Sequence, residues 1–450
     1  MSSIQKTIVE GTLYLSLSNT LVKLFSLVSY VIIVSRLDLY DYGIFVLLTS
    51  LSGPAAVFVF FGFNQVFFSN FAQAKGSGNL ARMKGLVREY YGLSSLLLFC
   101  FIIGVYIMRK FLVQYYDIYI LHYFWELSFF ILSQLLLNMV LLLVNANEQF
   151  KQSSFLASLE SISRSFLVII FAGGLSAQSV LIIYASAKSI AVLVGLFYFI
   201  KLIIPLIKTE TPPEKKVLLT IFKSHGKWEI IRVILEQASN PLKLWLIKIF
   251  VNVQSVAVVD FAQNMYGTIL GFFPVQSVIF PIISRVIGTK ELVGRIILKA
   301  KKYSLIFYAL FFTIVAFVLP YLLQMLFPQY SGYTLFILFV LLHVFTQVYR
   351  MGQPALLYAL NQQKFLVQIF PLLFVAELIP YIVLTYFWGI WGAVLSWHIH
   401  VMATGFIVAI FLRRKYHMDM WVWKDFFSFD EYDKMLLSKI TTKIKGIVGL

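Results

Sequence analysis

The chain has 450 residues, of which 60% are hydrophobic and 13% are charged, and its formal net charge is +17. Soluble domains contain about 45–50% apolar and about 25% charged residues. This composition, with a mean hydropathy of +0.85, therefore excludes a water-soluble globular domain and predicts a protein that lies in lipid. One cysteine, Cys100, excludes an intramolecular disulfide, and the scattered histidines favour neither a metal site nor a cofactor.

Twelve stretches have the apolar character expected of membrane spans, each of which needs about 20 mostly apolar residues. In chain order they are 11–34, 41–63, 90–108, 121–145, 155–175, 179–204, 228–250, 255–282, 303–326, 331–349, 365–387 and 389–412. Charged residues interrupt the fifth and seventh stretches, which are assigned from their place in the series. The sequence thus predicts an all-α polytopic membrane protein with twelve transmembrane helices.

The loops between these spans alternate in charge. Lysine and arginine gather in the segments 75–88, 208–227 and 285–302 and in the C-terminal tail. The connections between spans five and six, nine and ten, and eleven and twelve contain neither residue; Arg36 and the Arg109–Lys110 pair are exceptions on the sparse side. Because lysine and arginine concentrate in cytoplasmic loops, we expect both termini in the cytoplasm. The positive charge is then mainly topogenic, and no nucleic-acid partner is expected.

A proline-containing connection divides the chain into two halves. We predict an N-terminal six-helix lobe (1–204), a cytoplasmic linker (205–227), a C-terminal six-helix lobe (228–412) and a cytoplasmic tail (413–450). Leu437, Ile440, Ile444 and Ile447 of the tail recur at helical spacing, with lysines between them. That pattern is typical of an amphipathic helix on the inner leaflet, although a solvated tail fits it equally well.

Charged side chains within the predicted spans mark candidate sites, because each costs about 2.5–3.5 kcal/mol at the centre of a bilayer. The cations singled out are Lys23, Arg164, Lys188, Arg232 and Lys243, and the acids are Glu160, Glu229, Glu236, Asp260 and Glu377; Lys248 is expected instead to extend to the membrane surface. Positive charge is in surplus in the first half and roughly balanced in the second. We therefore predict that the five cations bind an anionic substrate, and that Glu377, Glu236 and Asp260 are candidates for binding a coupling ion.

Pairing within a helix is the alternative for some of these residues. The two pairs at a spacing of four are Glu160 with Arg164 and Arg232 with Glu236. Each pair can be structural or can contact a ligand, and the spacing leaves both open. Lys23 and Lys188 have no such partner in their own helices, which favours a place for them on a wet cavity.

Four local patterns occur in order along the chain: Tyr42-Gly43-Ile44-Phe45, Asn147-Glu148-Gln149-Phe150-Lys151, Asn361-Gln362-Gln363-Lys364 and Gly389-Ile390-Trp391-Gly392-Ala393-Val394. Together with the twelve-span layout, the sequence resembles the Wzx-like flippases for O-antigen and exopolysaccharide repeat units. These flippases belong to the multidrug/oligosaccharidyl-lipid/polysaccharide (MOP) exporter superfamily.

The resemblance implies two six-helix lobes around a central cavity in the bacterial inner (cytoplasmic) membrane. It implies that the substrate is an oligosaccharide linked to undecaprenyl diphosphate, moved from the inner to the outer leaflet by alternating access during lipopolysaccharide or other surface polysaccharide biosynthesis. The expected partners are this lipid-linked oligosaccharide, membrane lipids, a polysaccharide polymerase and a chain-length regulator. Lys23 matches by position the lumenal cations expected to contact the diphosphate.

Two other functions fit a polytopic chain. A multidrug exporter of the same superfamily would favour acidic cavity residues for cationic drugs, whereas the first half here is cationic. A membrane glycosyltransferase or polymerase would use acids such as Asp38 and Asp41 in an outer loop. Such enzymes usually carry a large outer loop, and every predicted outer loop here is short. A transporter is therefore the preferred interpretation, and an enzyme is not expected.

The predicted orientation can be tested by single-cysteine labelling in a Cys100→Ser background. Cysteines placed at Arg82, Lys215 and Lys299 should react with a membrane-impermeant reagent only after the cells are opened, because basic loops stay in the cytoplasm. Labelling of position 215 in intact cells would contradict this topology.

Overall fold

In a computed structural model of the chain, residues 3–116, 122–223, 227–272, 283, 290–360 and 362–418 are described. Regular structure among these residues consists of α-helices and short 3-10 helices, without a strand. The predicted all-α fold class is confirmed. The predicted amphipathic tail helix lies outside the described residues.

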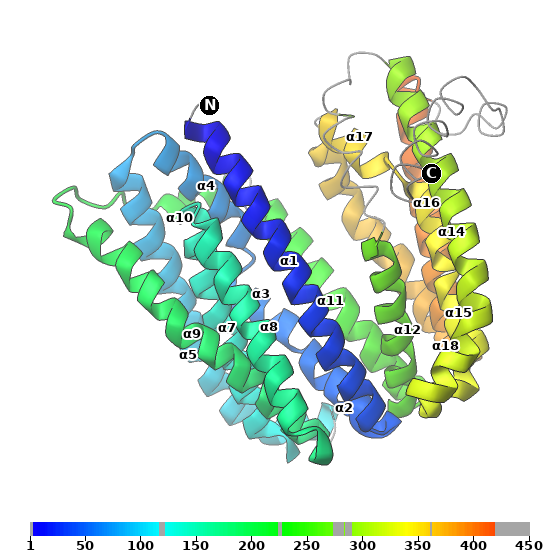
Figure 1. The fold of residues 1–450 in the computed structure, drawn as a ribbon. Helices are drawn as coiled ribbons and strands as arrows, with labels where there is room; N and C mark the ends of the chain where they lie inside the picture. The colour runs from blue at the N-terminus through cyan, green and yellow to red at the C-terminus, as the bar shows by residue number, and fades with distance from the viewer. Residues whose placement is uncertain are drawn as a thin grey trace, which may run out of the picture. The chain divides into compact units, whose positions relative to one another are not determined.

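The helices follow one another with short connections (Figure 1). In chain order they are α1 (Ser3–Arg36), α2 (Leu39–Ser50), α3 (Ser52–Phe60), α4 (Asn64–Gly76), α5 (Leu80–Tyr116), α7 (Phe124–Ala146), α8 (Phe150–Ile170), η1 (Ala172–Gly174), α9 (Ala177–Lys208), α10 (Val217–Ile221), α11 (Lys227–Phe250), α12 (Val253–Phe272), α14 (Lys290–Leu326), η3 (Pro328–Tyr333), α15 (Thr334–Leu341), α16 (His343–Arg350), α17 (Gln353–Ala359) and α18 (Gln363–Tyr416).

Eight helical stretches among the described residues are long and apolar enough to cross a membrane. One of them, Pro371–Tyr416, covers parts of the last two predicted spans. Each of the twelve predicted spans falls mainly on helical residues, while residue 121 and residues 273–282 are not described. The chain is thus a multi-pass membrane protein, with the count of twelve holding approximately.

Helix α18 is interrupted where two spans were expected to meet. Gly389 has φ 57° and ψ −137°, a conformation that only glycine adopts readily. The helix resumes immediately and continues to Tyr416. Gly389 therefore separates the predicted spans 365–387 and 389–412 without a loop between them.

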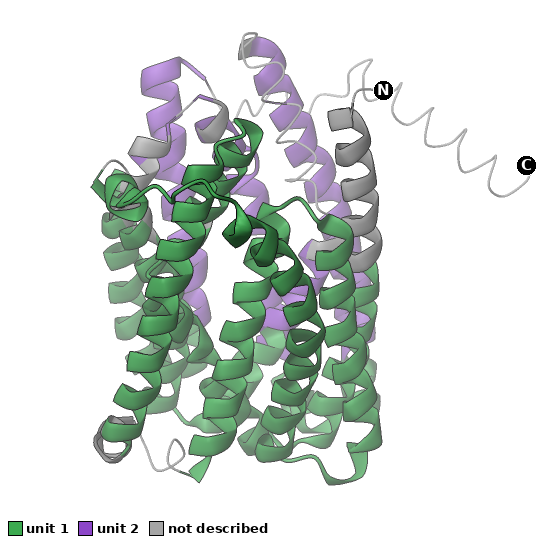
Figure 2. Ribbon diagram, turned by 90° about the vertical axis from the view of Figure 1, so that its left-hand side faces the viewer, with its two compact units in different colours: residues 1–262, 320–334, 367–393 green, residues 263–319, 335–366, 394–450 purple. Residues whose placement is uncertain are grey.

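The residues fall into two compact units (Figure 2). Unit 1 contains residues 1–262, 320–334 and 367–393, and unit 2 contains residues 263–319, 335–366 and 394–450. Helix α11 and the first half of α12 belong to unit 1 with the N-terminal helices, so this division does not follow the predicted lobe boundaries. The lobe assignment stays a prediction.

Within unit 1, α8 packs between α1 and α9, and α9 packs along α7 (Figure 1). Ser176 caps the start of α9: its hydroxyl accepts a hydrogen bond from the Ser179 amide, and its own amide donates to the Ser179 hydroxyl. Gly195 lets α9 approach α7, since a Cβ at this position would lie 2.7 Å from Val140 Cγ1. These contacts fix α8 and α9 side by side, and both helices contribute to the charged site.

Gly43, part of the aromatic-glycine pattern at the start of the second span, has a packing role. A Cβ at position 43 would overlap the backbone carbonyl of Val253, so α2 and the start of α12 meet through this glycine. Gly92 in α5 has no atom within 4 Å of the corresponding position and makes a matched control.

We expect Gly43→Ala to destabilise the protein by about 1–3 kcal/mol, because a backbone must move to admit the methyl group. Gly92→Ala should be neutral or slightly stabilising, since alanine favours helix. Unfolding temperatures of the two purified variants in detergent test this. Equal unfolding temperatures would contradict the close approach.

Candidate functional site

One carboxylate holds two cations inside unit 1. Glu160 Oε1 lies 3.4 Å from Arg164 Nη1, one turn away on α8, and 3.5 Å from Lys188 Nζ on α9. The three side chains are 14%, 13% and 7% exposed, respectively. The pair that the spacing within α8 allows is present, and Lys188 obtains from α8 the partner that its own helix lacks. The cluster keeps one surplus positive charge.

Aromatic rings cover the cations of this cluster. Lys188 Nζ lies 5.1 Å from the ring centre of Phe130 on α7 and 5.2 Å from that of Tyr184, one turn earlier on α9. The Arg164 guanidinium lies 4.9 Å from the Tyr184 ring centre. Cation–π attraction strengthens where water is excluded, so these rings help to hold the surplus charge at low exposure.

Serines join the cluster to α1. Arg164 Nη2 donates to Ser26 Oγ at 2.6 Å, and Ser26 Oγ lies 3.3 Å from Ser161 Oγ on α8. One turn further, Ser29 and Ser165 are hydrogen-bonded at 2.7 Å. Small hydroxyl side chains allow two helices to approach closely in lipid. Ser26 and Ser29 on α1 therefore serve largely as a helix contact with α8.

Lys23 lies one turn before Ser26 on α1 and is exposed within its unit. Among the described side chains, it forms no ion pair. It lies close along α1 to the Arg164–Ser26 contact, so a second positive charge adjoins the surplus of the cluster.

The second-half cation Lys243 has a different environment. It forms an ion pair with Glu377, and the two side chains are 17% and 18% exposed. Tyr381 donates a hydrogen bond to the Lys243 carbonyl at 3.1 Å. The two charges cancel, so Lys243 contributes no surplus, and Glu377 is engaged by a cation from a helix 134 residues away in sequence.

Of the remaining predicted residues, Asp260 lies near enough to Tyr184 to act on it electrostatically, and Tyr184 is the ring beside Arg164 and Lys188. Asp260 on α12 accepts a hydrogen bond from Tyr42 of α2 at 2.6 Å. Glu236 is exposed on α11. Arg232 also lies on α11, but its side chain is outside the described residues, so its predicted pair with Glu236 stays a prediction.

Sequence reasoning missed the contacts between helices. Glu160 with Lys188, Lys243 with Glu377, and Tyr42 with Asp260 join residues 28, 134 and 218 positions apart. Only the pair of Glu160 with Arg164, four residues apart on one helix, could be recognised from the sequence. The sequence did show opposite charges on apolar helices, and such charges need partners within a membrane. It did not show which residues pair with one another.

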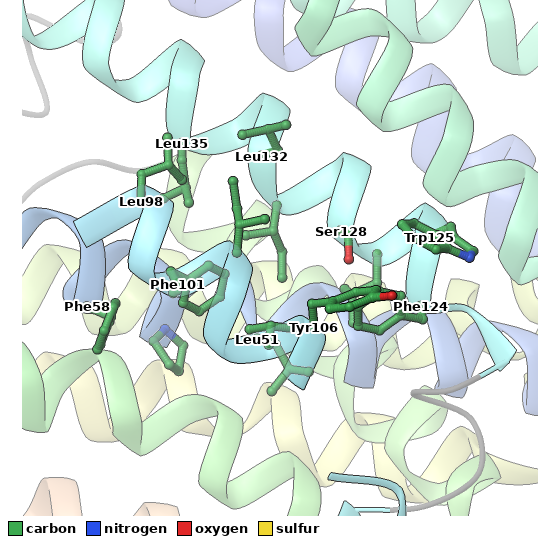
Figure 3. A pocket seen from close by; sticks show the side chains of 16 residues that line it. Leu51, Phe58, Leu98, Phe101, Tyr106, Phe124, Trp125, Ser128, Leu132 and Leu135 are labelled. Atoms are coloured by element: carbon green, nitrogen blue, oxygen red, sulfur yellow. The ribbon is translucent and has the colours of Figure 1, made fainter. Parts of the chain in front are cut away.

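An apolar groove lies elsewhere in unit 1 (Figure 3). Its volume is about 410 Å³, and α3, α5 and α7 line it, with rings from Phe58, Phe101, Tyr106 and Trp125. Ser128 adds one hydroxyl, and no charged residue is among its described lining. The groove suits a hydrocarbon chain and lacks the cations that a phosphate group requires.

The chain belongs to the polysaccharide biosynthesis protein family, whose model matches residues 8–287. A search of the curated proteins finds no match. Among solved structures, an inward-facing MATE-family multidrug resistance transporter of the MOP superfamily has a TM-score of 0.70 at 12% identity, covering 90% of this chain and 98% of that one.

Two further structures extend this likeness. The lipid II flippase MurJ, in an inward closed conformation, has a TM-score of 0.66 at 14% identity, covering 93% of this chain and 89% of its own. A MOP superfamily transporter from Pyrococcus furiosus, described as having a binding pocket of reverse polarity, has a TM-score of 0.60 at 11% identity, covering 91% and 95%. The chain therefore shares the fold of these MOP-superfamily transporters.

Because two cations share Glu160, substitutions at this cluster and at an exposed ion pair should lower the free energy of unfolding by different amounts. Glu160→Gln leaves Arg164 and Lys188 close together without an anion and should lower stability by about 3–5 kcal/mol. Lys188→Met removes one cation, leaves Glu160 paired with Arg164, and should cost less. Glu148→Gln breaks the exposed pair with Lys75 and should cost at most about 1 kcal/mol.

Unfolding temperatures in detergent give this order directly. A Glu160→Gln variant as stable as Glu148→Gln would contradict the shared buried carboxylate.

Proposed function

We propose that this protein is a flippase that moves an undecaprenyl-diphosphate-linked oligosaccharide from the inner to the outer leaflet of the bacterial inner membrane by alternating access. The single observation that carries the proposal is the cationic surplus of the Glu160–Arg164–Lys188 cluster, next to Lys23 on α1. Membership of a polysaccharide biosynthesis family and the MOP fold support the same assignment.

The diphosphate is the part of this substrate that cannot cross lipid, because a charged group is costly at the bilayer centre. Lys23 would meet it first, since that side chain is exposed and its charge is not cancelled by an ion pair. Arg164 and Lys188 would supply the second attraction, because one carboxylate neutralises only one of the two. A planar guanidinium can bind phosphate oxygens in pairs, whereas an ammonium acts as a point charge.

The lipid tail can remain in the bilayer while the head group crosses inside the protein. An inside-negative membrane potential helps an anion to move outward, by about 2.3 kcal/mol per charge per 100 mV across the full field. A polysaccharide polymerase and a chain-length regulator acting at the outer leaflet are the expected partners of such a step. In this proposal both termini lie in the cytoplasm, because lysine and arginine concentrate in cytoplasmic loops.

A multidrug exporter is the second candidate, since MATE transporters share the fold. Cationic drugs require acidic groups at the site. Glu160 and Glu377 are each engaged by cations, and Asp260 accepts a hydrogen bond from Tyr42; the two ion pairs favour the anionic substrate.

Deletion of the gene should abolish display of one surface polysaccharide while its lipid-linked unit accumulates inside the cell. Normal display in the deletion strain would refute the proposal. Sensitivity to cationic drugs with normal display would favour the exporter.

Transport should depend more on the charge of the side chains at positions 23 and 188 than on their shape. Lys23→Arg and Lys188→Arg should restore much of the display in the deletion strain, alanine variants should restore little, and glutamate variants least, because they repel the diphosphate. Lys201→Ala, an exposed cation on α9, is the control and should complement fully. Protein abundance in the membrane must be matched. Complementation to the wild-type level by Lys23→Glu or Lys188→Glu would exclude this cluster from substrate binding.

A further inference from the structure

The apolar groove of unit 1 is open to lipid. Helix α3 contacts both α5 and α7, and side chains of all three helices line the groove. Ile102, Tyr106 and Trp125 of this lining are exposed, and they lie on helices that are apolar and long enough to span a membrane. The groove is therefore a place where the hydrocarbon of a single lipid can enter the protein surface.

The groove is about as long as one leaflet is deep. From Leu98 to Tyr106, α5 rises by about 12 Å, and from Trp125 to Leu135, α7 rises by about 15 Å. The hydrocarbon of a whole bilayer is about 30 Å thick. One acyl chain of a phospholipid matches this length, whereas the polyprenyl tail of a lipid carrier is several times longer.

The two ends of the groove differ in chemistry. Leu98 and Leu135 lie at the end toward the middle of their helices, and Tyr106, Phe124 and Trp125 gather at the other end (Figure 3). Tyrosine and tryptophan are enriched where a membrane meets water, which places the second end at the level of the lipid head groups. A chain lying in the groove would thus carry its head group to these rings.

Arg109 continues the groove-lining face of α5. It follows Ile102 and Val105 at spacings of seven and four, so the three residues share one face of the helix. Its guanidinium lies 4.4 Å from the ring centre of Tyr106, one turn beyond the apolar lining. An arginine can bind phosphate oxygens in pairs. Arg109 is also one of the cations that break the charge alternation of the loops, and a lipid phosphate would account for its place there.

The charge of Arg109 is available to a ligand. Among the described side chains it forms no ion pair. Glu126, next to Trp125 on α7, accepts a hydrogen bond at 2.6 Å from Gln178 of α9. Helical spacing puts Glu126 on the face of α7 opposite to Ser128, which lines the groove. This acid is therefore directed away from the groove and does not oppose an anion at its end.

We propose that the groove and Arg109 form a binding site for phosphatidylglycerol, an anionic phospholipid, with one acyl chain in the groove and the phosphate at Arg109. On the predicted orientation the site lies in the outer leaflet, because α5 reaches Arg109 on the side where lysine and arginine are sparse. The chain would fill the space that α3, α5 and α7 leave between them and would stabilise the folded unit by binding to it. The site does not depend on the proposed function.

Photo-crosslinking in lipid nanodiscs tests the site. Phosphatidylglycerol and phosphatidylcholine with the same diazirine-bearing acyl chain differ in net charge, and mass spectrometry locates the residues that they modify. Leu193, an exposed residue of α9, corrects for the amount of each lipid. After this correction, crosslinks to Leu98 and Leu132 should favour phosphatidylglycerol by about fivefold, the effect of one cation near an anionic lipid.

Two variants ask whether this preference comes from Arg109. The ratio of the two lipids in the groove should fall to about one in Arg109→Gln, because the cation is lost. It should stay at the wild-type value in Arg36→Gln, which removes another cation from the same sparse side. Equal crosslinking by the two lipids in the wild type would mean that bulk lipid fills the groove, and it would overturn the site. A ratio that is unchanged in Arg109→Gln would overturn it as well.

A third lipid tests the choice of occupant. Undecaprenyl phosphate bears a phosphate on a much longer tail, and it should not reduce the crosslinking of phosphatidylglycerol to Leu98 and Leu132 when added in equal amount. Loss of these crosslinks in the wild type, but not in Arg109→Gln, would show that the groove holds the lipid carrier and would overturn the assignment to a phospholipid.

Discussion

The charged site of unit 1 depends on one carboxylate, Glu160, which two cations share among the spanning helices. Arg164 is tied to Glu160 by helix geometry, and Lys188 is tied to it by the packing of α9 against α8. A buried charge without a partner costs several kcal/mol, so Glu160 makes both cations tolerable. It cannot neutralise both, and the remaining charge is what an anionic substrate would meet. Aromatic rings and the Ser26 hydroxyl complete the environment.

The two groups of paired charges in unit 1 differ in net charge. Lys243 and Glu377 cancel, whereas the cluster around Glu160 does not.

The structural features that depend on composition and on local residue spacing could be predicted from the sequence. Long apolar runs located the helices, because lipid demands about 20 apolar residues per span. The spacing of Glu160 and Arg164 predicted their pair. It could not predict that Lys188 joins them, since that contact depends on which helices pack together. The role of Gly43 against Val253 and the Gly389 break likewise follow from backbone geometry. The contact between His343 and His398 could not be predicted either, because 55 residues separate them in the sequence.

The central claim is that surplus positive charge in unit 1 binds a diphosphate, and equilibrium binding to purified protein in lipid nanodiscs tests it most directly. Undecaprenyl diphosphate and the uncharged undecaprenol share a tail, so their difference isolates the head group. The account predicts that the diphosphate binds more tightly, that added salt weakens this preference, and that Arg164→Gln reduces it. Equal affinity for the two lipids, or a preference unchanged in Arg164→Gln, would contradict it.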